Sequence, residues 1–341
     1  MLKILQILLL PLSLVYGFIM ALRNLAFRLG ILNSFRPNIP SITVGNLSVG
    51  GTGKTPMIEY LLDLNLGNNP AVVSRGYGRK TKGLLKVESS GTAEEFGDES
   101  LQMAQKYPEA QFWVSEKRAV GAKQAQKAGS DLILFDDAYQ HRYIQSDFQI
   151  LLSAYDSMFF KDFVLPAGRL REFRAGAKRA QCIVITKCPH ALSEMEQASI
   201  RNSIRHYSKA QVFFAGLSYQ IPQNAKGQDL KDSEIEVITA IAKPEPLLTQ
   251  LQQKYTISET WLFRDHHLFS TEDLESIWER KTEENRTWVC SEKDYVKLAP
   301  LFIAADRIDQ LFYIAVKHRF LGNDAKDFQS LIKSHFSKAL D

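Results

Sequence analysis

The residues with the most distinctive chemistry lie in a glycine-rich run near the amino end of the chain. The sequence Ser-Val-Gly-Gly-Thr-Gly-Lys-Thr occupies positions 48–55, after the apolar segment 42–44 and before a helical pattern over 57–64. In such a context the glycines let successive main-chain N–H groups face one hollow, and the helix start adds positive potential there. A lysine then reaches the outer phosphates of a nucleotide, and a threonine hydroxyl ligates Mg²⁺. The run predicts a phosphate-binding loop, with Lys54 at the phosphates and Thr55 at the metal.

One position departs from the usual spacing of these loops. The strict pattern, G-x-x-x-x-G-K-[ST], has glycine where this chain has Ser48. The neighbouring glycines supply the backbone freedom instead, so the loop is expected to bend differently at its start. The predicted nucleotide-binding residues are Ser48, Val49, Gly50, Gly51, Thr52, Gly53, Lys54 and Thr55.

Two adjacent acids, Asp136 and Asp137, follow the continuous apolar segment 131–135. A segment that is apolar throughout is typical of a buried parallel strand, and the carboxyl end of such a strand faces the ligand crevice. We expect one carboxylate to meet the metal and the other to orient a water or a neighbouring group. Helix capping, for which aspartate is common, is the alternative interpretation.

A general base is expected from one of two further acidic segments. Asp98, in Gly-Asp-Glu at a predicted helix start, can take a hydroxyl proton beside the γ-phosphate, or it can simply cap the helix. His266 lies in the segment Asp-His-His (265–267), just before a helix start at Ser270. An Asp-His couple that tunes a base across a cleft, metal ligation and stabilisation of a turn all fit this segment.

Composition limits the class of protein. The chain has 341 residues, of which 45% are hydrophobic and 23% charged, with a net charge of +4. This balance predicts a globular protein and argues against a nucleic-acid partner, while a cationic patch for anionic lipid or phosphate remains compatible. The three cysteines have no Cys-x-x-Cys spacing, which favours buried thiols in a reducing compartment and suggests no zinc site.

The first residues differ in kind from the rest. No charge occurs from Ile4 to Leu22, whereas Lys3 precedes this run and arginines follow it. The run is long enough to span a bilayer, and it exceeds the apolar core of a signal peptide. Because Pro11 and Gly17 interrupt it, a helix lying in the membrane interface is an alternative to a spanning helix, and a buried domain helix is the third. We expect membrane attachment without cleavage.

Strands and helices alternate over about 180 residues after this run, which predicts an α/β fold with a doubly wound, P-loop NTPase-like sheet. The polar stretch 218–233 is the best linker. Beyond it, expected strands at 236–241, 256–262, 288–290 and 311–316 and a closing helix over 325–339 predict a second, smaller α/β domain. The predicted boundaries are 1–35 for the membrane-associated helix, 36–220 for the nucleotide-binding kinase domain and 221–341 for the smaller domain.

Seven segments, in their order and spacing, resemble the motifs of the tetraacyldisaccharide 4′-kinase family, membrane-bound enzymes of lipid A biosynthesis. They are Gly-Asn with Gly-Gly-Thr-Gly-Lys-Thr-Pro (45–56), Ser-Arg-Gly-Tyr-Gly-Arg (74–79), Gly-Asp-Glu (97–99), Asp-Asp-x-x-Gln-His (136–141), Leu-Arg-Glu (170–172), Asp-His-His (265–267) and Glu-Lys-Asp-x-Val-Lys (292–297). Ala138 and Tyr139 stand where the family often has Gly-Phe, and Ser100 stands where it has proline. These departures affect loop shape and remove no reacting group.

The resemblance implies an ATP- and Mg²⁺-dependent kinase that phosphorylates the 4′-hydroxyl of tetraacyldisaccharide 1-phosphate to give lipid IVA. It implies a location at the cytoplasmic face of the inner membrane, with a lipid disaccharide substrate, a membrane contact through the N-terminal helix and no obligate protein partner. By motif position, Asp98, His266 and Lys54 are expected to be catalytic, and Thr55, Asp136 and Asp137 to lie at the metal. The expected substrate-binding residues are Arg79, Gln140, His141, Arg171 and Glu172.

Two other functions fit a membrane-attached phosphate loop. The first is a GTPase-type switch or assembly factor, which would carry a guanine-reading Asn-Lys-x-Asp. The chain offers Thr-Lys-Cys-Pro at 186–189 instead, without the asparagine and the acid. The second is a membrane-tethered nucleotide-binding protein without catalysis, in which Asp98 would be dispensable.

Overall fold

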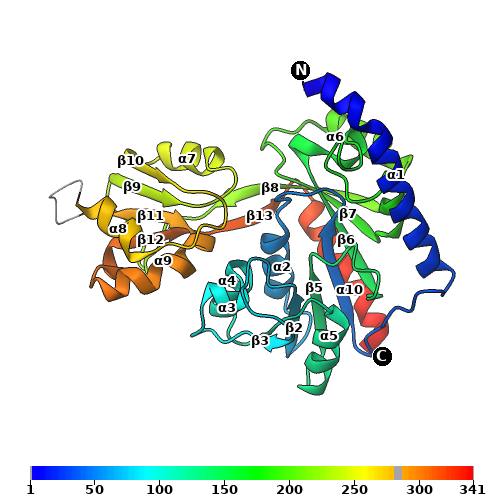
Figure 1. Cartoon of the computed structure of the whole chain (residues 1–341), viewed down its shortest axis with the longest axis horizontal. Coiled ribbons are helices and arrows are strands. Elements are labelled where there is room, and N and C mark those ends of the chain that lie inside the picture. Colours follow the sequence, from blue (N-terminus) through cyan, green and yellow to red (C-terminus); the bar gives the residue numbers. More distant parts are fainter. Residues whose placement is uncertain (1, 280–285, 341) are drawn as a thin grey trace.

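The computed structural model describes residues 2–279 and 286–340, which form two α/β units and a long helix at the amino end (Figure 1). The larger unit contains a nine-stranded sheet in the order β13-β8-β7-β6-β1-β5-β2-β4-β3. The smaller unit contains a four-stranded sheet in the order β10-β9-β11-β12. The fold is thus the doubly wound α/β architecture that the alternation of strands and helices predicts.

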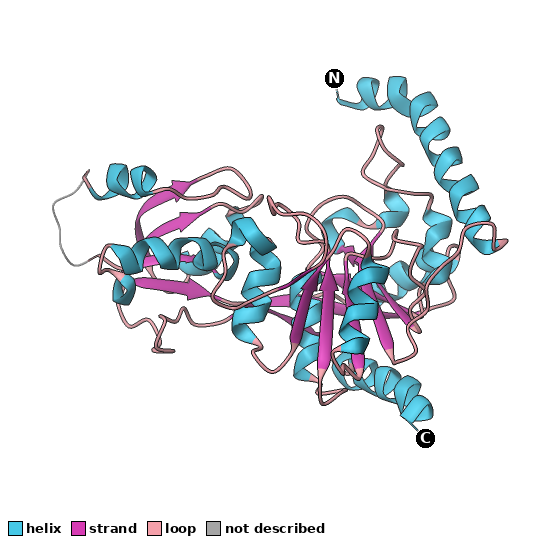
Figure 2. Cartoon of the chain, turned by 60° about the horizontal axis from the view of Figure 1, so that its bottom comes forward, coloured by secondary structure: helices cyan, strands magenta, loops and turns pink. Residues whose placement is uncertain are grey.

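Neighbouring strands of the larger sheet are parallel except at its two ends, where β3 pairs with β4 and β13 with β8 in antiparallel fashion. The central strands are buried at every residue, because helices cover both faces of the sheet (Figure 2). The strands are β1 (Ser41–Asn46), β2 (Pro70–Ser74), β3 (Leu85–Lys86), β4 (Gln111–Val114), β5 (Leu132–Asp136), β6 (Phe148–Ala154), β7 (Cys182–Thr186), β8 (Gln211–Tyr219) and β13 (Val316–Phe320).

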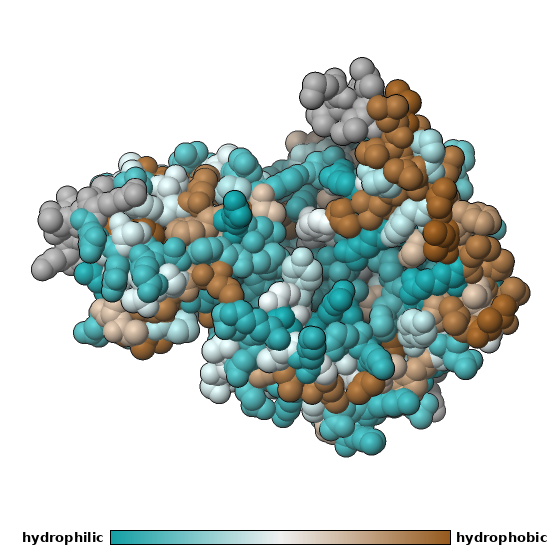
Figure 3. Space-filling view, in the orientation of Figure 1, coloured by the Kyte–Doolittle hydropathy of each residue, from teal (hydrophilic) through white to brown (hydrophobic). Residues whose placement is uncertain are grey.

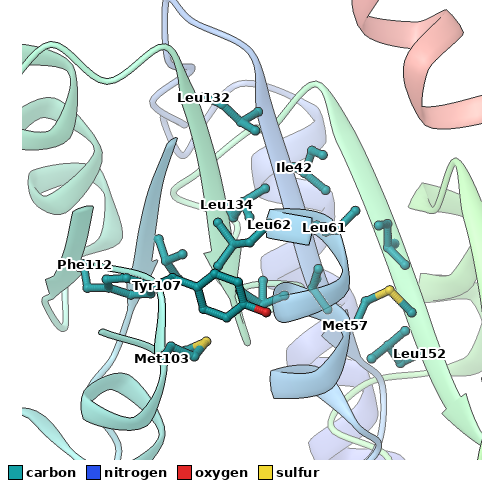
Figure 4. Packing of buried hydrophobic residues seen from close by; sticks show 14 of the residues in the cluster. Ile42, Met57, Leu61, Leu62, Met103, Tyr107, Phe112, Leu132, Leu134 and Leu152 are labelled. Carbon is teal, nitrogen blue, oxygen red and sulfur yellow. The ribbon is translucent and has the colours of Figure 1, made fainter. Parts of the chain in front are cut away.

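The two faces of this sheet bury different sets of helices. On one face α2 (Lys54–Asp63), α4 (Asp98–Lys106) and α10 (Asp324–Leu340) pack over side chains of β1, β5 and β6, and Figure 4 shows part of this core around Met57, Leu61 and Tyr107. On the other face lie α5 (Arg118–Lys127) and α6 (Glu194–Arg205). Along β5, Leu134 belongs to the first core and Phe135 to the second, as the two-residue repeat of a strand requires.

The remaining elements of the larger unit are short. They are the helix α3 (Ala93–Phe96) and the 3-10 turns η1 (Tyr155–Ser157), η2 (Phe159–Lys161) and η3 (Arg174–Arg179).

The smaller unit is a parallel sheet of β9 (Glu234–Thr239), β10 (Thr256–Leu262), β11 (Trp288–Ser291) and β12 (Leu311–Ile314), with the 3-10 turn η4 (Ile308–Gln310) before its last strand. Its helices are α7 (Glu245–Gln252), α8 (Thr271–Trp278) and α9 (Glu292–Ala304). Trp288 and Phe302 are fully buried in its core.

The chain enters the smaller unit through β8 and returns through β13, so a two-stranded ribbon joins the units (Figure 1). The predicted single strand over 311–316 was wrong in one respect, because β12 ends at Ile314 in one sheet and β13 begins at Val316 in the other. The predicted boundary of 221–341 also differs from this arrangement. Phe320 on β13 and Phe328 on α10 are buried in the core of the larger unit. A contiguous apolar run gives no sign that its residues serve two different sheets.

The helix α1 (Leu2–Arg28) lies along the larger unit and is long and apolar enough to cross a membrane by length and composition. Its outward side chains are 58–69% exposed and form the apolar stripe shown in brown in Figure 3. These side chains are Ile7, Leu8, Leu12, Leu14, Val15, Phe18 and Ile19. On its inner side Gly17 allows close approach, since a Cβ there would lie 2.4 Å from the Phe173 ring.

Candidate active site

The predicted phosphate loop and acid pair lie at the carboxyl ends of the neighbouring parallel strands β1 and β5, the edge at which ligand crevices of such sheets form. The phosphate loop follows β1, and the acid pair ends β5. Two of the predicted catalytic residues stand at helix starts. Lys54 is the first residue of α2, and Asp98 is the first residue of α4. Partial positive charge is therefore available at the start of each of these helices.

The phosphate loop is held in shape by distant parts of the chain. The Val49 N–H donates to the Arg169 carbonyl over 2.8 Å, and the Thr186 hydroxyl donates to the Thr52 carbonyl over 2.8 Å. Gly53, whose φ of 81° favours glycine, contacts His318 Nε2 through its carbonyl oxygen at 2.8 Å. These anchors leave the loop pre-shaped for a ligand.

Several polar atoms beside the loop are buried without a partner among the described residues. They are the side-chain oxygens Asn46 Oδ1, Thr52 Oγ1 and Asp136 Oδ1. Because buried polar groups are normally hydrogen-bonded, this cluster indicates a place for a polar ligand.

Asp136 and Asp137 have opposite environments although they are adjacent. Asp136 is 4% exposed, and burial together with the nearby Glu99 carboxylate raises its pKa to about 7. Burial acts on Asp137 in the same direction, but Lys54 and Arg171 outweigh it and hold the pKa of Asp137 below its ordinary value. The Arg171 Nη1 atom lies 3.1 and 3.2 Å from the two Asp137 oxygens, and Lys54 Nζ lies 3.8 Å from the nearer one.

The donors present fit Mg²⁺ shared with a nucleotide rather than a metal held by protein alone. Within residues 2–279 and 286–340, no three His, Cys, Asp or Glu side chains group as a metal site. Protein-bound Mg²⁺ commonly takes one or two carboxylates and completes its shell with phosphate oxygens and water. The unpaired Asp136 oxygen beside the Glu99 charge, together with the Thr55 hydroxyl, meets that requirement.

Asp98 and His266 come together from the two units. His266 Nδ1 lies 2.9 Å from Asp98 Oδ2, and Asp98 is 5% exposed. Burial would raise the pKa of Asp98, but the hydrogen bond from His266 and the charge of Lys293 outweigh it and lower the pKa. The same hydrogen bond raises the pKa of His266. The pair therefore keeps the carboxylate ionised in a buried place.

Lys293 is a site residue for which the sequence analysis assigned no role. Its Nζ atom lies 3.2 Å from His266 Nε2, 3.7 Å from Asp98 Oδ2 and 3.4 Å from Asp265 Oδ1. An ammonium that donates to Nε2 leaves the ring proton on Nδ1, where it faces Asp98. Glu99 was missed in the same way, although both residues belong to motifs noted in the sequence.

The loop that carries His266 is fixed by bonds inside the smaller unit. The His266 N–H donates to the Ala240 carbonyl over 3.2 Å, and Lys297 Nζ donates to the His267 carbonyl over 3.0 Å. His267 Nε2 lies 2.8 Å from Asp273 Oδ2 at the start of α8. His266 itself has a φ of 60°, so its place depends on this support.

The predicted substrate-binding residues divide into two groups. Gln140 and Arg171 lie beside Asp137, with Arg171 Nη1 3.3 Å from Gln140 Oε1. Glu172 is 2% exposed and accepts hydrogen bonds from Arg179, Asn24 and Gln140. Its contacts in the described structure are thus internal, which gives it a supporting position.

The other two predicted substrate-binding residues lie in basic surroundings. Burial and the charges of Arg118, Arg23 and Arg75 lower the pKa of His141 to about 4, so its ring is neutral. Arg79 pairs with Glu116 at 2.6 Å and lines a cavity of about 510 Å³ formed by the segment 75–82 and Glu116. The Tyr77 side chain of that segment lies 5.0 Å from the His266 ring, so the cavity adjoins the Asp98–His266 pair.

The chain is similar to known proteins over nearly its whole length. A model of the tetraacyldisaccharide-1-P 4′-kinase family matches residues 5–337. Tetraacyldisaccharide 4′-kinase of Flavobacterium johnsoniae is 40% identical over 348 residues, covering 99% of both chains. The Cytophaga hutchinsonii enzyme is 36% identical and covers 99% of this chain and 97% of its own. The crystal structure of LpxK from Aquifex aeolicus in complex with ATP superimposes with a TM-score of 0.78 at 27% identity, covering 97% of this chain and 99% of that one.

Proposed function

The chain belongs to the tetraacyldisaccharide-1-P 4′-kinase family, and from this premise we propose how its own residues carry out the reaction. The activity is transfer of the γ-phosphoryl group of ATP to the 4′-hydroxyl of tetraacyldisaccharide 1-phosphate, which gives lipid IVA in lipid A biosynthesis. The bond between the hydroxyl oxygen and the γ-phosphorus forms, the bond from that phosphorus to the β-phosphate oxygen breaks, and ADP leaves.

The loop of residues 48–55 binds the ATP phosphates. Its main-chain N–H groups and the start of α2 attract the phosphate oxygens, and Lys54 neutralises charge that grows on the transferring group. The Thr52 hydroxyl and the side-chain amide oxygen of Asn46, which are buried and have no hydrogen-bond partner among the described residues, support a polar ligand here.

Thr55 and Asp136 hold Mg²⁺ together with the phosphates. When bound, the metal would supply positive charge that neutralises charge on the phosphate oxygens. Asp137 orients Lys54 and Arg171 toward the same space, which agrees with its contacts to both.

Asp98 takes the proton of the acceptor hydroxyl, and His266 shares the positive charge that this proton brings to the pair. The observation that carries this proposal is the 2.9 Å contact that joins Asp98 of the larger unit to His266 of the smaller unit. The lowered pKa keeps Asp98 ionised at neutral pH, and the ionised carboxylate is the form that can accept a proton.

The acceptor approaches from the side of α1, and the apolar stripe of this helix supports attachment of the protein to the cytoplasmic face of the inner membrane. Arg171, Gln140, His141 and Arg79 then contact the polar part of the lipid disaccharide. Glu172 supports them through Gln140 and Arg179. The 1-phosphate of the acceptor contacts basic side chains on this side of the crevice, among them Arg171.

The test is the change Asp98→Asn, assayed with γ-labelled ATP and the disaccharide lipid. We expect turnover to fall by about 10²- to 10⁴-fold, the range for loss of a general base. Binding of a fluorescent ATP analogue should be retained, and Lys54→Ala should weaken it. Unchanged turnover would remove Asp98 from the mechanism, and it is the result expected of a nucleotide-binding protein without catalysis.

A further inference from the structure

A largely buried ionic cluster connects the two units. It consists of Glu59 on α2, Gln102 and Lys106 on α4, and Glu292 at the start of α9, and we call it the Lys106 cluster. No step of the reaction uses these four side chains.

The contacts are short and pass from one unit to the other. Lys106 Nζ lies 2.6 Å from Glu59 Oε2 and 2.9 Å from Glu292 Oε1. Gln102 Nε2 donates to Glu59 Oε1 and to Glu292 Oε2, each over 3.1 Å. The Glu59 side chain is 3% exposed, that of Glu292 13% and that of Lys106 23%. One ammonium and one amide thus hold two carboxylates from different units together.

Each of the three helices also supplies the active site from its first residues. Lys54 is the first residue of α2, Asp98 is the first of α4, and Lys293 is the second of α9. At 1.5 Å per residue, the cluster residues of α2 and α4 lie about 6–12 Å along the helix from Lys54 and Asp98. On α9, Glu292 directly precedes Lys293. Displacement of α9 at the cluster would therefore move Lys293 away from Asp98 and His266.

Lys106 supplies the positive charge that both carboxylates of the cluster need. Without its ammonium, Glu59 and Glu292 would face each other as like charges in a place with little water. Loss of Glu292 alone is milder, because Lys106 keeps its 2.6 Å partner Glu59 inside the larger unit.

We propose that the Lys106 cluster is a positioning device, which fixes α9 of the smaller unit against α2 and α4 so that Lys293 and His266 meet Asp98. This inference rests on the proposed roles of Asp98 and His266. Lys106 and Glu292 are positioning residues, since neither touches the reacting atoms.

The experiment uses the full chain and the change Glu292→Ala, with Asp309→Ala as the matched control. Asp309 also pairs with a lysine, Lys226 at 2.8 Å, but both side chains are exposed and neither has a role in the proposed reaction. We expect Glu292→Ala to lower kcat by about 10- to 100-fold, because small displacements of reacting groups cost rates of this order. The KM for ATP should stay within twofold of the wild type, since the phosphate loop is untouched.

The pH profile separates positioning from simple stabilisation. If Lys293 and His266 retreat, they no longer hold down the pKa of Asp98, so the acid limb of kcat should move to higher pH in Glu292→Ala. Lys106→Arg, which can keep both carboxylate contacts, should preserve the wild-type limb, and Asp309→Ala should leave rate and limb unchanged.

Two results would overturn the proposal. One is a Glu292→Ala enzyme with wild-type kcat and pH profile. The other is a Glu292→Ala enzyme whose kcat and ATP-analogue binding fall equally while the acid limb of kcat stays in place. That result would show that the cluster only stabilises the folded protein. In either case Asp98→Asn still tests the proposed function separately, because that substitution leaves the cluster intact.

Discussion

The ionisation of Asp98 depends on groups that reach it from the smaller unit. Because burial alone would raise the pKa of this carboxyl, its lowered pKa relies on the hydrogen bond from His266 and the charge of Lys293. We therefore expect His266→Ala to raise the pKa of Asp98 and to move the acid limb of the kcat profile to higher pH. Turnover at neutral pH should fall by about 10²-fold. The measurement is kcat between pH 5 and 9, with His190→Ala in an exposed loop as the control.

The Asp98–His266 pair also makes the stability of the protein depend on pH. A depressed pKa at Asp98 adds stability above the unfolded value of the carboxyl, and this contribution is lost as the pH falls through the folded value. A raised pKa at His266 adds stability below the unfolded value of imidazole, and this contribution is lost as the pH rises through the folded value. The two units should thus be held together best in the weakly acidic range between the two unfolded values. An acid limb unchanged in His266→Ala would contradict the coupling.

Asp136 presents the opposite case, since its ionised form is disfavoured without a cation. Burial and Glu99 raise its pKa to about 7, so at pH 8 its charge costs stability. We expect Asp136→Asn to raise the melting temperature of the nucleotide-free protein at pH 8 and to change it little at pH 5.5. It should also weaken Mg²⁺-dependent binding of an ATP analogue. Sites that bind charged ligands commonly show this exchange of stability for function.

Asp137 is the matched control for this prediction. Its pKa is lowered by Lys54 and Arg171, so Asp137→Asn should lower the melting temperature at pH 8 instead of raising it. If both substitutions shifted the melting temperature in the same direction, the opposite environments assigned to the two acids would be incorrect. Differential scanning fluorimetry at the two pH values measures both.

At the scale of elements, the ribbon of β8 and β13 connects the units and also reaches the phosphate loop. His318 on β13 is 6% exposed, and burial lowers its pKa to about 4, so the neutral ring can donate from Nε2 to the Gly53 carbonyl. We expect His318→Leu to weaken ATP-analogue binding by up to about 10-fold, because the loop loses a buried hydrogen bond worth about 0.5–1.5 kcal/mol while the Gly53 carbonyl keeps the bond from the Met57 N–H. His318→Gln, which retains an N–H donor, should recover part of the loss. Equal affinities for both variants would contradict a role for this hydrogen bond.

The same ribbon marks the limit of what the sequence predicts. The strand, loop and helix around residues 48–55, the strand that ends at Asp136 and most other strands were confirmed, because glycine spacing and apolar runs are local signals. The division of the run 311–316 between two sheets was not predicted, since it depends on which partner each half pairs with. Contacts between side chains of the two units could not be predicted from the sequence either. Lys293 meets His266 and Asp98 only because the smaller unit packs on α4, and no local pattern encodes that packing.

At the scale of the whole molecule, α1 connects the apolar stripe to the crevice. Its inner side is hydrogen-bonded to the segment that carries Arg171. The Tyr16 hydroxyl donates to the Arg171 carbonyl over 3.2 Å, Ser13 Oγ accepts from the Ala167 N–H over 2.9 Å, and Asn24 donates to Glu172 over 2.7 Å. Because the same helix presents apolar side chains outward, insertion of the stripe into a bilayer would set the distance between the lipid surface and Asp137.

This arrangement predicts that the apolar stripe governs access to lipid and not to nucleotide. Leu14 and Phe18 lie one helical turn apart, are 63% and 61% exposed, and have no place in the core. We expect the double change Leu14→Asp and Phe18→Asp to lower partition into phospholipid vesicles by at least about 10²-fold, since two large apolar side chains contribute about 3–6 kcal/mol when buried. Turnover of vesicle-borne acceptor should fall in parallel, while ATP-analogue binding stays at the wild-type value. Met195→Asp, at an 83% exposed position on α6, should change none of these quantities. Wild-type partition of the double variant in vesicle flotation would show that the membrane meets another face of the molecule.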